Sequence, residues 1–310
     1  MLRAGGVSSG DRILLALPIS STVGSDAYLA LFDMGALTLA SERASLADIR
    51  EFAPTVLIAT VSDALRLGQL AAVDQVDLAE AEVRLVIVTG EPGGSLPVTR
   101  RIIEGRWGAT CLDVYSLTEL GVIGRGCGTP RDGLHLDDEQ LTLQVLEPDS
   151  DEVVDPSELG ELVITTPETW GTPLANFHTG DLVRLEPGGC ACGEGAWAIG
   201  GVLGRVSERM LVRGTVLLPS TIEQVVRRHP AVVDFQLRTF LVRGECEVLV
   251  LVDANASIAS EGDRARVAAE VSEDLRRSLG LRLHCDVLSP DDSPASDLDA
   301  GRRARRLNRP

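Results

Sequence analysis

The sequence predicts an α/β protein: a mostly parallel sheet covered by helices, a small antiparallel β unit, and a small α+β domain. The first 115 residues alternate apolar strands with helical stretches, a pattern that requires a parallel sheet covered on both faces. Short strands separated by Gly, Pro and Asp turns follow between Gly121 and Leu203. The last hundred residues have a pattern of their own. We therefore expect two domains, residues 1–204 and 205–310.

The elements of the first region follow from runs of apolar residues and from helical periodicity. Strands are predicted over residues 13–18, 56–60, 84–89 and 110–114, and helices over residues 26–37, 45–52, 61–73 and 97–107. In the antiparallel unit the clearest strands are residues 141–146, 161–165 and 181–185.

The C-terminal region begins with an extended segment, residues 209–218, that turns at Gly214. A helix over residues 220–228 has Ser220 as its expected N-cap and Pro230 beyond its end. A hairpin of strands 233–240 and 245–252, a helix over 263–279 and a strand over 281–288 complete the domain.

Composition excludes several functions. The 310 residues carry 29 basic and 46 acidic side chains, a formal charge of -17, and every basic residue is Arg. Without lysine there is no Schiff base, no Walker-type phosphate-binding lysine and no lysine general base. The acidic balance argues against nucleic acid and anionic membranes as partners, because both need a cationic surface.

Nothing in the sequence predicts export or membrane insertion. The first twelve residues lack the apolar run of a signal peptide, and no stretch approaches 18 uninterrupted apolar residues. Six cysteines in 310 residues are too sparse for a disulfide scaffold. We therefore expect a soluble cytoplasmic protein.

Several short motifs carry polar residues, and one of them, Asp113–Glu119, follows a predicted buried strand, where α/β sheets place ligands. Each is weak alone, but their order and spacing are specific. They are Gly90-Glu-Pro92, Asp113-Val-Tyr-Ser-Leu-Thr-Glu119, Gly160-Glu-Leu-Val-Ile-Thr165, Phe177-His-Thr-Gly-Asp-Leu182, Cys190-Ala-Cys-Gly193 and Gly204-Arg205.

Together these motifs resemble the adenylate-forming superfamily, most closely its phenylacetate-CoA ligase and coenzyme F390 synthetase-like branch. The resemblance covers nearly all of the chain. It implies that a carboxylic acid is joined to AMP and that the acyl group then passes to a thiol. Glu91 lies in a segment similar to the GAEP segment of that branch, which implies a place in the nucleotide site.

The resemblance implies a role for each matched residue. Tyr115 would stack on adenine, and Thr118 would hydrogen-bond phosphate. Glu119 would hold Mg²⁺, a hard cation that prefers carboxylate oxygen. Asp181 would accept hydrogen bonds from the ribose hydroxyls, and Arg205 would approach the ribose from the hinge.

The chain also departs from the family pattern. The family's phosphate loop should precede Gly6, so the resemblance is to an N-terminally truncated member. The hinge Asp appears as Ser207, and the C-terminal Gly-Lys appears as Gly301-Arg302, where Arg302 would take the catalytic lysine's place. Arg can bind phosphate, but its planar guanidinium is not equivalent to the compact ammonium group of lysine. His178 stands where the family carries Arg, and its role stays open.

Cysteine and histidine spacing predicts a structural zinc site. Cys127 precedes His135 by eight residues, and Cys190 and Cys192 lie on a later turn. Three thiolates and one imidazole suit tetrahedral zinc, and the resemblance adds that some members of this branch carry zinc at these positions. The alternative is a set of unlinked thiols and a surface histidine.

The leading hypothesis is an acid–thiol ligase that uses ATP and Mg²⁺ to activate a small, aromatic carboxylic acid. The acceptor would be CoA or the phosphopantetheine thiol of a carrier protein. Alternatives keep the fold without adenylation, as an ATP-independent acyl transferase or as a non-catalytic scaffold subunit. The face left by the missing subdomain would then support a homodimer.

Overall fold

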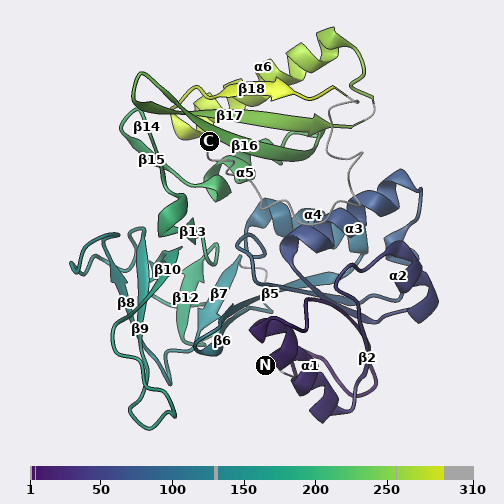
Figure 1. Ribbon diagram of the computed structural model, residues 1–310, viewed down its shortest axis with the longest axis vertical. Coiled ribbons are helices and arrows are strands. Elements are labelled where there is room, and N and C mark those ends of the chain that lie inside the picture. The colour runs from purple at the N-terminus through teal and green to yellow at the C-terminus, as the bar shows by residue number, and fades with distance from the viewer. Residues whose placement is uncertain (1, 4, 129–131, 256, 290–310) are drawn as a thin grey trace. The chain divides into compact units, whose positions relative to one another are not determined.

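The computed structural model describes residues 2–3, 5–128, 132–255 and 257–289. The chain divides into two units, Met1–Val206 and Ser207–Pro310. Each unit has a hydrophobic core of its own. Figure 1 shows the helices and strands of both units.

The described part of the first unit contains a nine-stranded sheet in the order β11-β12-β7-β6-β5-β4-β3-β1-β2. Its parallel half pairs β2 with β1, β1 with β3, β3 with β4, and β4 with β5. The strands of this half are β1 (Arg12–Ala16), β2 (Leu37–Ala40), β3 (Val56–Ala59), β4 (Leu85–Thr89) and β5 (Thr110–Leu117). Their central members are buried on both faces, as the continuous apolar runs predict.

Helices cover the two faces of this parallel half. Alternate strand residues such as Leu14 and Leu57 pack with α2–α4, whereas Ile13 and Val56 pack in a second cluster with Leu31 of α1. The period of two along each strand therefore assigns every side chain to one helical layer. The helices are α1 (Thr22–Met34), α2 (Leu46–Phe52), α3 (Val61–Val73) and α4 (Pro97–Trp107), with a short 3-10 helix η1 (Leu78–Glu80).

The antiparallel region is divided between two sheets, a division that the sequence did not predict. Four of its strands extend the main sheet beyond β5: β6 (Gly121–Gly126), β7 (Gly133–Leu136), β12 (Ala196–Ile199) and β11 (Leu185–Glu186). The others form a separate antiparallel sheet in the order β13-β10-β9-β8. They are β8 (Thr142–Leu146), β9 (Gly160–Thr165), β10 (Phe177–Val183) and β13 (Gly204–Arg205).

The second unit is an α+β sandwich of helices against a sheet. Strands β16 (Val232–Val242) and β17 (Glu245–Ala254) form the expected hairpin, and β18 (His284–Val287) pairs with β17 in parallel. The core contains residues from α5 (Pro219–Val226), α6 (Glu261–Leu279) and the sheet. The remaining elements are a 3-10 helix η2 (Val206–Glu208) at the boundary and the short hairpin β14 (Met210–Val212) and β15 (Thr215–Leu217).

The predicted elements are present, but several boundaries differ. Helix α1 begins four residues earlier than expected, because the Ser21 side chain accepts a hydrogen bond from the Gly24 amide and caps the helix there. It ends at Gly35, which leaves room for β2, a strand that the sequence analysis missed. Ser220 does not cap α5: Leu218 is the N-cap residue, and Pro219 fills the first helical position.

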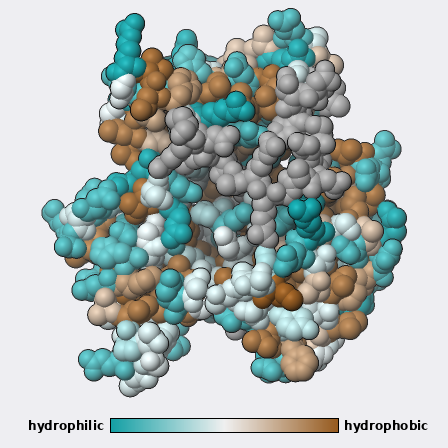
Figure 2. All heavy atoms as spheres, in the orientation of Figure 1, coloured by the Kyte–Doolittle hydropathy of each residue, from teal (hydrophilic) through white to brown (hydrophobic). Residues whose placement is uncertain are grey.

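Helix α1 carries an exposed apolar surface. Tyr28, Leu29 and Phe32 are 40%, 58% and 71% exposed, and they lie on one side of the helix because Phe32 follows Leu29 by three residues and Tyr28 by four. Hydrophobic side chains also reach the surface over this part of the first unit (Figure 2). Among the described residues, no helix is both long and apolar enough to cross a bilayer.

Candidate functional site

The end of β5 meets the second sheet at a buried hydrogen bond. The Tyr115 hydroxyl donates to Asp181 Oδ2 over 2.7 Å, and both residues are more than nine-tenths buried. Burial, followed by the negative charge of Asp181, raises the pKa of Tyr115 well above its usual range. Tyr115 therefore remains a neutral donor, and the bond ties β5 of the main sheet to β10.

Arg205 completes this cluster from β13. Its Nε lies 3.1 Å from Asp181 Oδ1, and its Nη2 donates to the Thr179 carbonyl over 2.7 Å. Each carboxylate oxygen of Asp181 thus faces a different donor, Tyr115 on one side and Arg205 on the other. Because the Arg205 side chain is half exposed, a ligand can approach Asp181 from that side.

Asp181 lies in a bulged stretch of β10, residues 178–181, which we call the aspartate turn. Gly180 has a φ of 73°, a left-handed conformation that a β-carbon would strain. The Gly180 amide donates to Glu161 Oε1 over 2.9 Å, and His178 Nδ1 lies 3.0 Å from Glu161 Oε2. Glu161 lies in the motif Gly160–Thr165, but the sequence alone indicates no role for it.

Thr118 and Glu119 lie in the turn that directly follows β5, and both are exposed. Glu119 makes no hydrogen bond or ion pair within the described part of the chain, so its carboxylate is available to a cation. Just before this turn, the Ser116 hydroxyl lies 3.2 Å from the Thr89 hydroxyl at the end of β4. This hydroxyl pair lies where the parallel strands end, and the sequence analysis did not single it out.

The structure brings some of the predicted site residues together and leaves others apart. Tyr115, Asp181 and Arg205 are in direct contact. Glu91 instead accepts a hydrogen bond from the Ser62 amide over 2.9 Å, in the first turn of α3. Arg302 lies outside the described residues.

A second carboxylate, Asp113, lies two residues before Tyr115 on β5 and is buried. The Ser95 hydroxyl donates to Asp113 Oδ2 over 2.7 Å. A β-carbon on Gly94 would lie 2.5 Å from the Asp113 carboxyl carbon, so only glycine allows this close approach. Burial raises the pKa of Asp113 to about 6, although hydrogen bonds from Ser95 partly oppose the rise.

The four predicted metal ligands converge. The potential ligand atoms of Cys127, His135, Cys190 and Cys192 all lie within 4.8 Å of one another. Cys127 Sγ is 3.7 Å from Cys190 Sγ, and Cys192 Sγ is 3.3 Å from His135 Nε2. The antiparallel pairing of β7 with both β6 and β12 brings the two halves of the cluster together.

Two of these distances, 3.7 Å and 3.3 Å, are close to those of a tetrahedral metal site. Zinc bonds of about 2.3 Å to sulfur and about 2.0 Å to nitrogen place tetrahedral ligand atoms roughly 3.5–3.8 Å apart. A disulfide would need sulfurs about 2.05 Å apart, so Cys127 and Cys190 are not cross-linked. His135 packs edge-on against Trp197, with ring centroids 4.8 Å apart, and this packing orients its ring.

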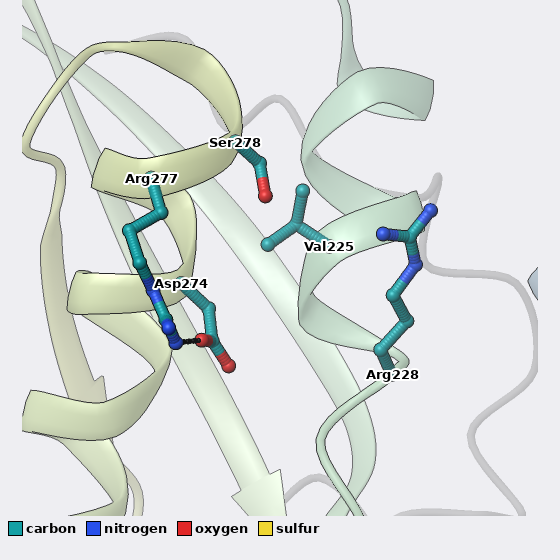
Figure 3. A pocket seen from close by; sticks show the side chains of 5 residues that line it. All are labelled: Val225, Arg228, Asp274, Arg277 and Ser278. Atoms are coloured by element: carbon teal, nitrogen blue, oxygen red, sulfur yellow. Dashed lines mark hydrogen bonds and ion pairs between the residues drawn. The ribbon is translucent and has the colours of Figure 1, made fainter.

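A separate hollow of about 290 Å³ lies between α5 and α6 in the second unit. Its lining residues are Val225, Arg228, Asp274, Arg277 and Ser278 (Figure 3). None of them is a predicted site residue, and Asp274 already forms an ion pair with Arg277. The hollow therefore adds nothing to the chemistry around Asp181.

Sequence comparison finds relatives among the phenylacetate-coenzyme A ligases, while no protein-family model matches the chain. The chain is 29% identical to the Pseudomonas putida ligase over 75% of its own length and 53% of that protein. It is 28% identical to the Thermus thermophilus ligase over 77% of its length and 50% of that protein. The chain thus spans about half the length of these curated relatives.

Solved structures share the fold. A 2-hydroxyisobutyryl-CoA ligase in complex with an acyl adenylate is matched with a TM-score of 0.84 and 21% identity, over 97% of this chain and 66% of that chain. A benzoate CoA ligase from Burkholderia xenovorans LB400 is matched with a TM-score of 0.70 and 20% identity, over 93% and 59%. The predicted fold class, an adenylate-forming α/β core with a smaller α+β part, is confirmed.

The buried Asp113 generates a prediction about pH. Because its pKa is raised from 3.8 to about 6 in the folded protein, the folded state favours the protonated carboxyl. The stability that this group contributes is fully present below pH 3.8 and is lost as the pH rises through 6. Asp113→Asn should remove that decline, a difference of roughly 3 kcal/mol in unfolding free energy between pH 3.8 and 7.

Urea unfolding of both proteins across this pH range measures the effect. Asp151→Asn, at an exposed loop position, is the matched control and should leave the pH dependence unchanged. Parallel stability curves for wild type and Asp113→Asn would contradict the prediction.

Proposed function

Because the chain belongs to the adenylate-forming superfamily and is similar to its phenylacetate-CoA ligase branch, we propose that it activates a small carboxylic acid with ATP and transfers the acyl group to a thiol. The observation that carries this proposal is the contact of Tyr115 and Arg205 with Asp181 at the carboxyl end of the parallel sheet. Ligands bind at this edge in open α/β sheets.

Within this proposal Asp181 accepts hydrogen bonds from the ribose hydroxyls. A ribose hydroxyl that approaches from the exposed side takes the place of Arg205 on Oδ1, while Tyr115 holds Oδ2 in position. The displaced guanidinium then lies beside the ribose. Tyr115 itself would contact adenine, and Glu91 would border the nucleotide from the end of β4.

The exposed turn after β5 would handle the phosphates. Thr118 offers a hydroxyl donor, and the unpaired carboxylate of Glu119 suits Mg²⁺, which prefers oxygen ligands. Bound Mg²⁺ would neutralise charge on the phosphates during adenylation. Arg302 would supply a further cation, and a guanidinium can hold phosphate oxygens bidentately.

The acid and the thiol acceptor are proposed from the similarity to the phenylacetate-coenzyme A ligases and from the chemistry of thiol acylation. An aromatic acid matches what phenylacetate-coenzyme A ligases are named for, and CoA or a carrier-protein phosphopantetheine would both offer the required thiol. The second candidate is acyl transfer without ATP. It is favoured by the complete lack of lysine, which removes the usual adenylation cation.

ATP–pyrophosphate exchange tests the proposal directly. The wild-type protein should catalyse exchange with at least one member of a panel of aryl, arylacetic and short hydroxy acids. Asp181→Asn should raise the KM for ATP by about tenfold or more, because it weakens charge-assisted hydrogen bonds to the ribose.

The control is Asp151→Asn, which should leave the KM unchanged. Adding CoA to the same reactions detects thioester formation. The adenylation proposal is wrong if no acid supports exchange and the protein binds no ATP. Acyl transfer from a thioester in the absence of ATP would establish the second candidate instead.

We also propose that Cys127, His135, Cys190 and Cys192 bind one structural Zn²⁺. The 3.7 Å and 3.3 Å separations between ligand atoms support this set. Four protein ligands leave no open coordination position, so the metal would link β6 and β7 to the connection before β12 without taking part in chemistry.

Metal analysis tests the zinc proposal. Purified protein should contain about one zinc per chain, and Cys190→Ser should lose the metal and several kcal/mol of stability. Cys246→Ser, at a cysteine outside the cluster, should retain both. The assignment is wrong if the wild-type protein purifies without metal and melts at the same temperature as Cys190→Ser.

The apolar surface of α1 supports a homodimer interface, which we propose between Tyr28, Leu29 and Phe32 of two copies. Light scattering after size exclusion should give the mass of a dimer for wild type and that of a monomer for Phe32→Asp. Asp26→Asn on the same helix is the control. A monomeric wild-type protein at micromolar concentration would refute the interface.

A further inference from the structure

We propose that Glu161 is a positioning residue that holds the aspartate turn in the shape that presents Asp181 to the ribose. This inference rests on the proposed nucleotide site and names a residue of that site which has no role in the motifs discussed above. Glu161 touches no ligand in this scheme; it acts through the backbone of residues 178–181.

The register of β9 and β10 shows why the turn needs support. His178 is paired with Val163 and Leu182 with Glu161, so three residues of β10 lie opposite one residue of β9. Thr179, Gly180 and Asp181 therefore bulge out of the ladder and lose regular strand hydrogen bonds. If their amides had no other partners, the backbone of these residues could change conformation, and Asp181 would be poorly oriented.

Two consecutive residues of β9 supply those partners. The Leu162 carbonyl accepts a hydrogen bond of 2.7 Å from the Thr179 hydroxyl. The same hydroxyl accepts a hydrogen bond of 3.1 Å from the Asp181 amide. The Glu161 carboxylate accepts the Gly180 amide with one oxygen and faces His178 Nδ1 with the other. The bulge is thereby fixed at each of its residues.

Burial makes the Glu161 contacts strong. Glu161 is only 7% exposed, and a buried carboxylate needs its hydrogen bonds to offset the loss of water. His178 faces one oxygen of the Glu161 carboxylate, and because its side chain is half exposed, replacing it should cost little stability. Glu161 therefore fixes the bulge directly through the Gly180 amide, and His178 orients the Glu161 carboxylate from the exposed side.

The test compares nucleotides that differ only in the ribose. Wild-type protein should bind ATP at least about tenfold more tightly than 2′,3′-dideoxy-ATP, because Asp181 accepts the ribose hydroxyls. Glu161→Ala should lose most of this discrimination while keeping its affinity for dideoxy-ATP. Loss of stability alone would weaken both nucleotides equally. Glu161→Gln, which retains both the shape and an acceptor oxygen, should restore discrimination.

Matched variants separate the outcomes. Glu158→Ala, an exposed glutamate just before β9, should behave as wild type. His178→Ala should lose part of the discrimination, and it carries the test if Glu161→Ala does not fold. A folded Glu161→Ala protein, or failing that a His178→Ala protein, that keeps the full preference for ATP would overturn the proposal.

Amide hydrogen exchange distinguishes this inference from the proposed function. The Gly180 amide should exchange about tenfold faster in Glu161→Ala than in wild type, whether or not nucleotide binds. If wild-type protein binds neither nucleotide, the proposed function fails. Faster exchange would then still support Glu161 as the anchor of the turn, and unchanged exchange would overturn it.

Discussion

The geometry of the first unit depends on one buried hydrogen bond, from the Tyr115 hydroxyl to Asp181. Tyr115 belongs to the main sheet and Asp181 to the smaller antiparallel sheet, so this bond adds a directional link between two sheets that also share a hydrophobic cluster. A neutral phenol that donates to a carboxylate in a water-poor setting makes a strong, directional contact. The position of Arg205 follows from it, because Arg205 binds the other oxygen of the same carboxylate.

Strand β5 positions Tyr115 for this contact through its pairing with two neighbouring strands. It pairs in parallel with β4 and antiparallel with β6, so it lies where the regular α/β layer gives way to hairpins. Cys111, Asp113 and Tyr115 share one face of the strand, since side chains alternate with a period of two. Along that face the surroundings change from apolar core, to the hydrogen bond between Asp113 and Ser95, to the site itself.

The aspartate turn and the cysteine cluster both lie in irregular backbone, and different contacts stabilise each of them. Hydrogen bonds donated to the Glu161 carboxylate and the Leu162 carbonyl fix the turn, and the proposed metal would fix the cluster. Buried polar groups of this kind are costly unless every member is paired. Both regions should therefore tolerate substitution less well than the exposed turns that follow β5 and precede β9.

The sequence by itself determined the parallel layer, the hairpin of the second unit and the cysteines and histidine that converge. Hydrophobic periodicity and the short spacings within each pair of ligands involve residues that are close in sequence. They can therefore be recognised without knowing the fold. Only the tertiary structure decided that the antiparallel strands divide between two sheets, that Glu91 binds the first turn of α3, and that Glu161 supports the aspartate turn. Those facts depend on strand pairing and on a bulge register between distant segments. A change of one residue in register would reverse which side chains face the site, and no single segment of the sequence specifies that register.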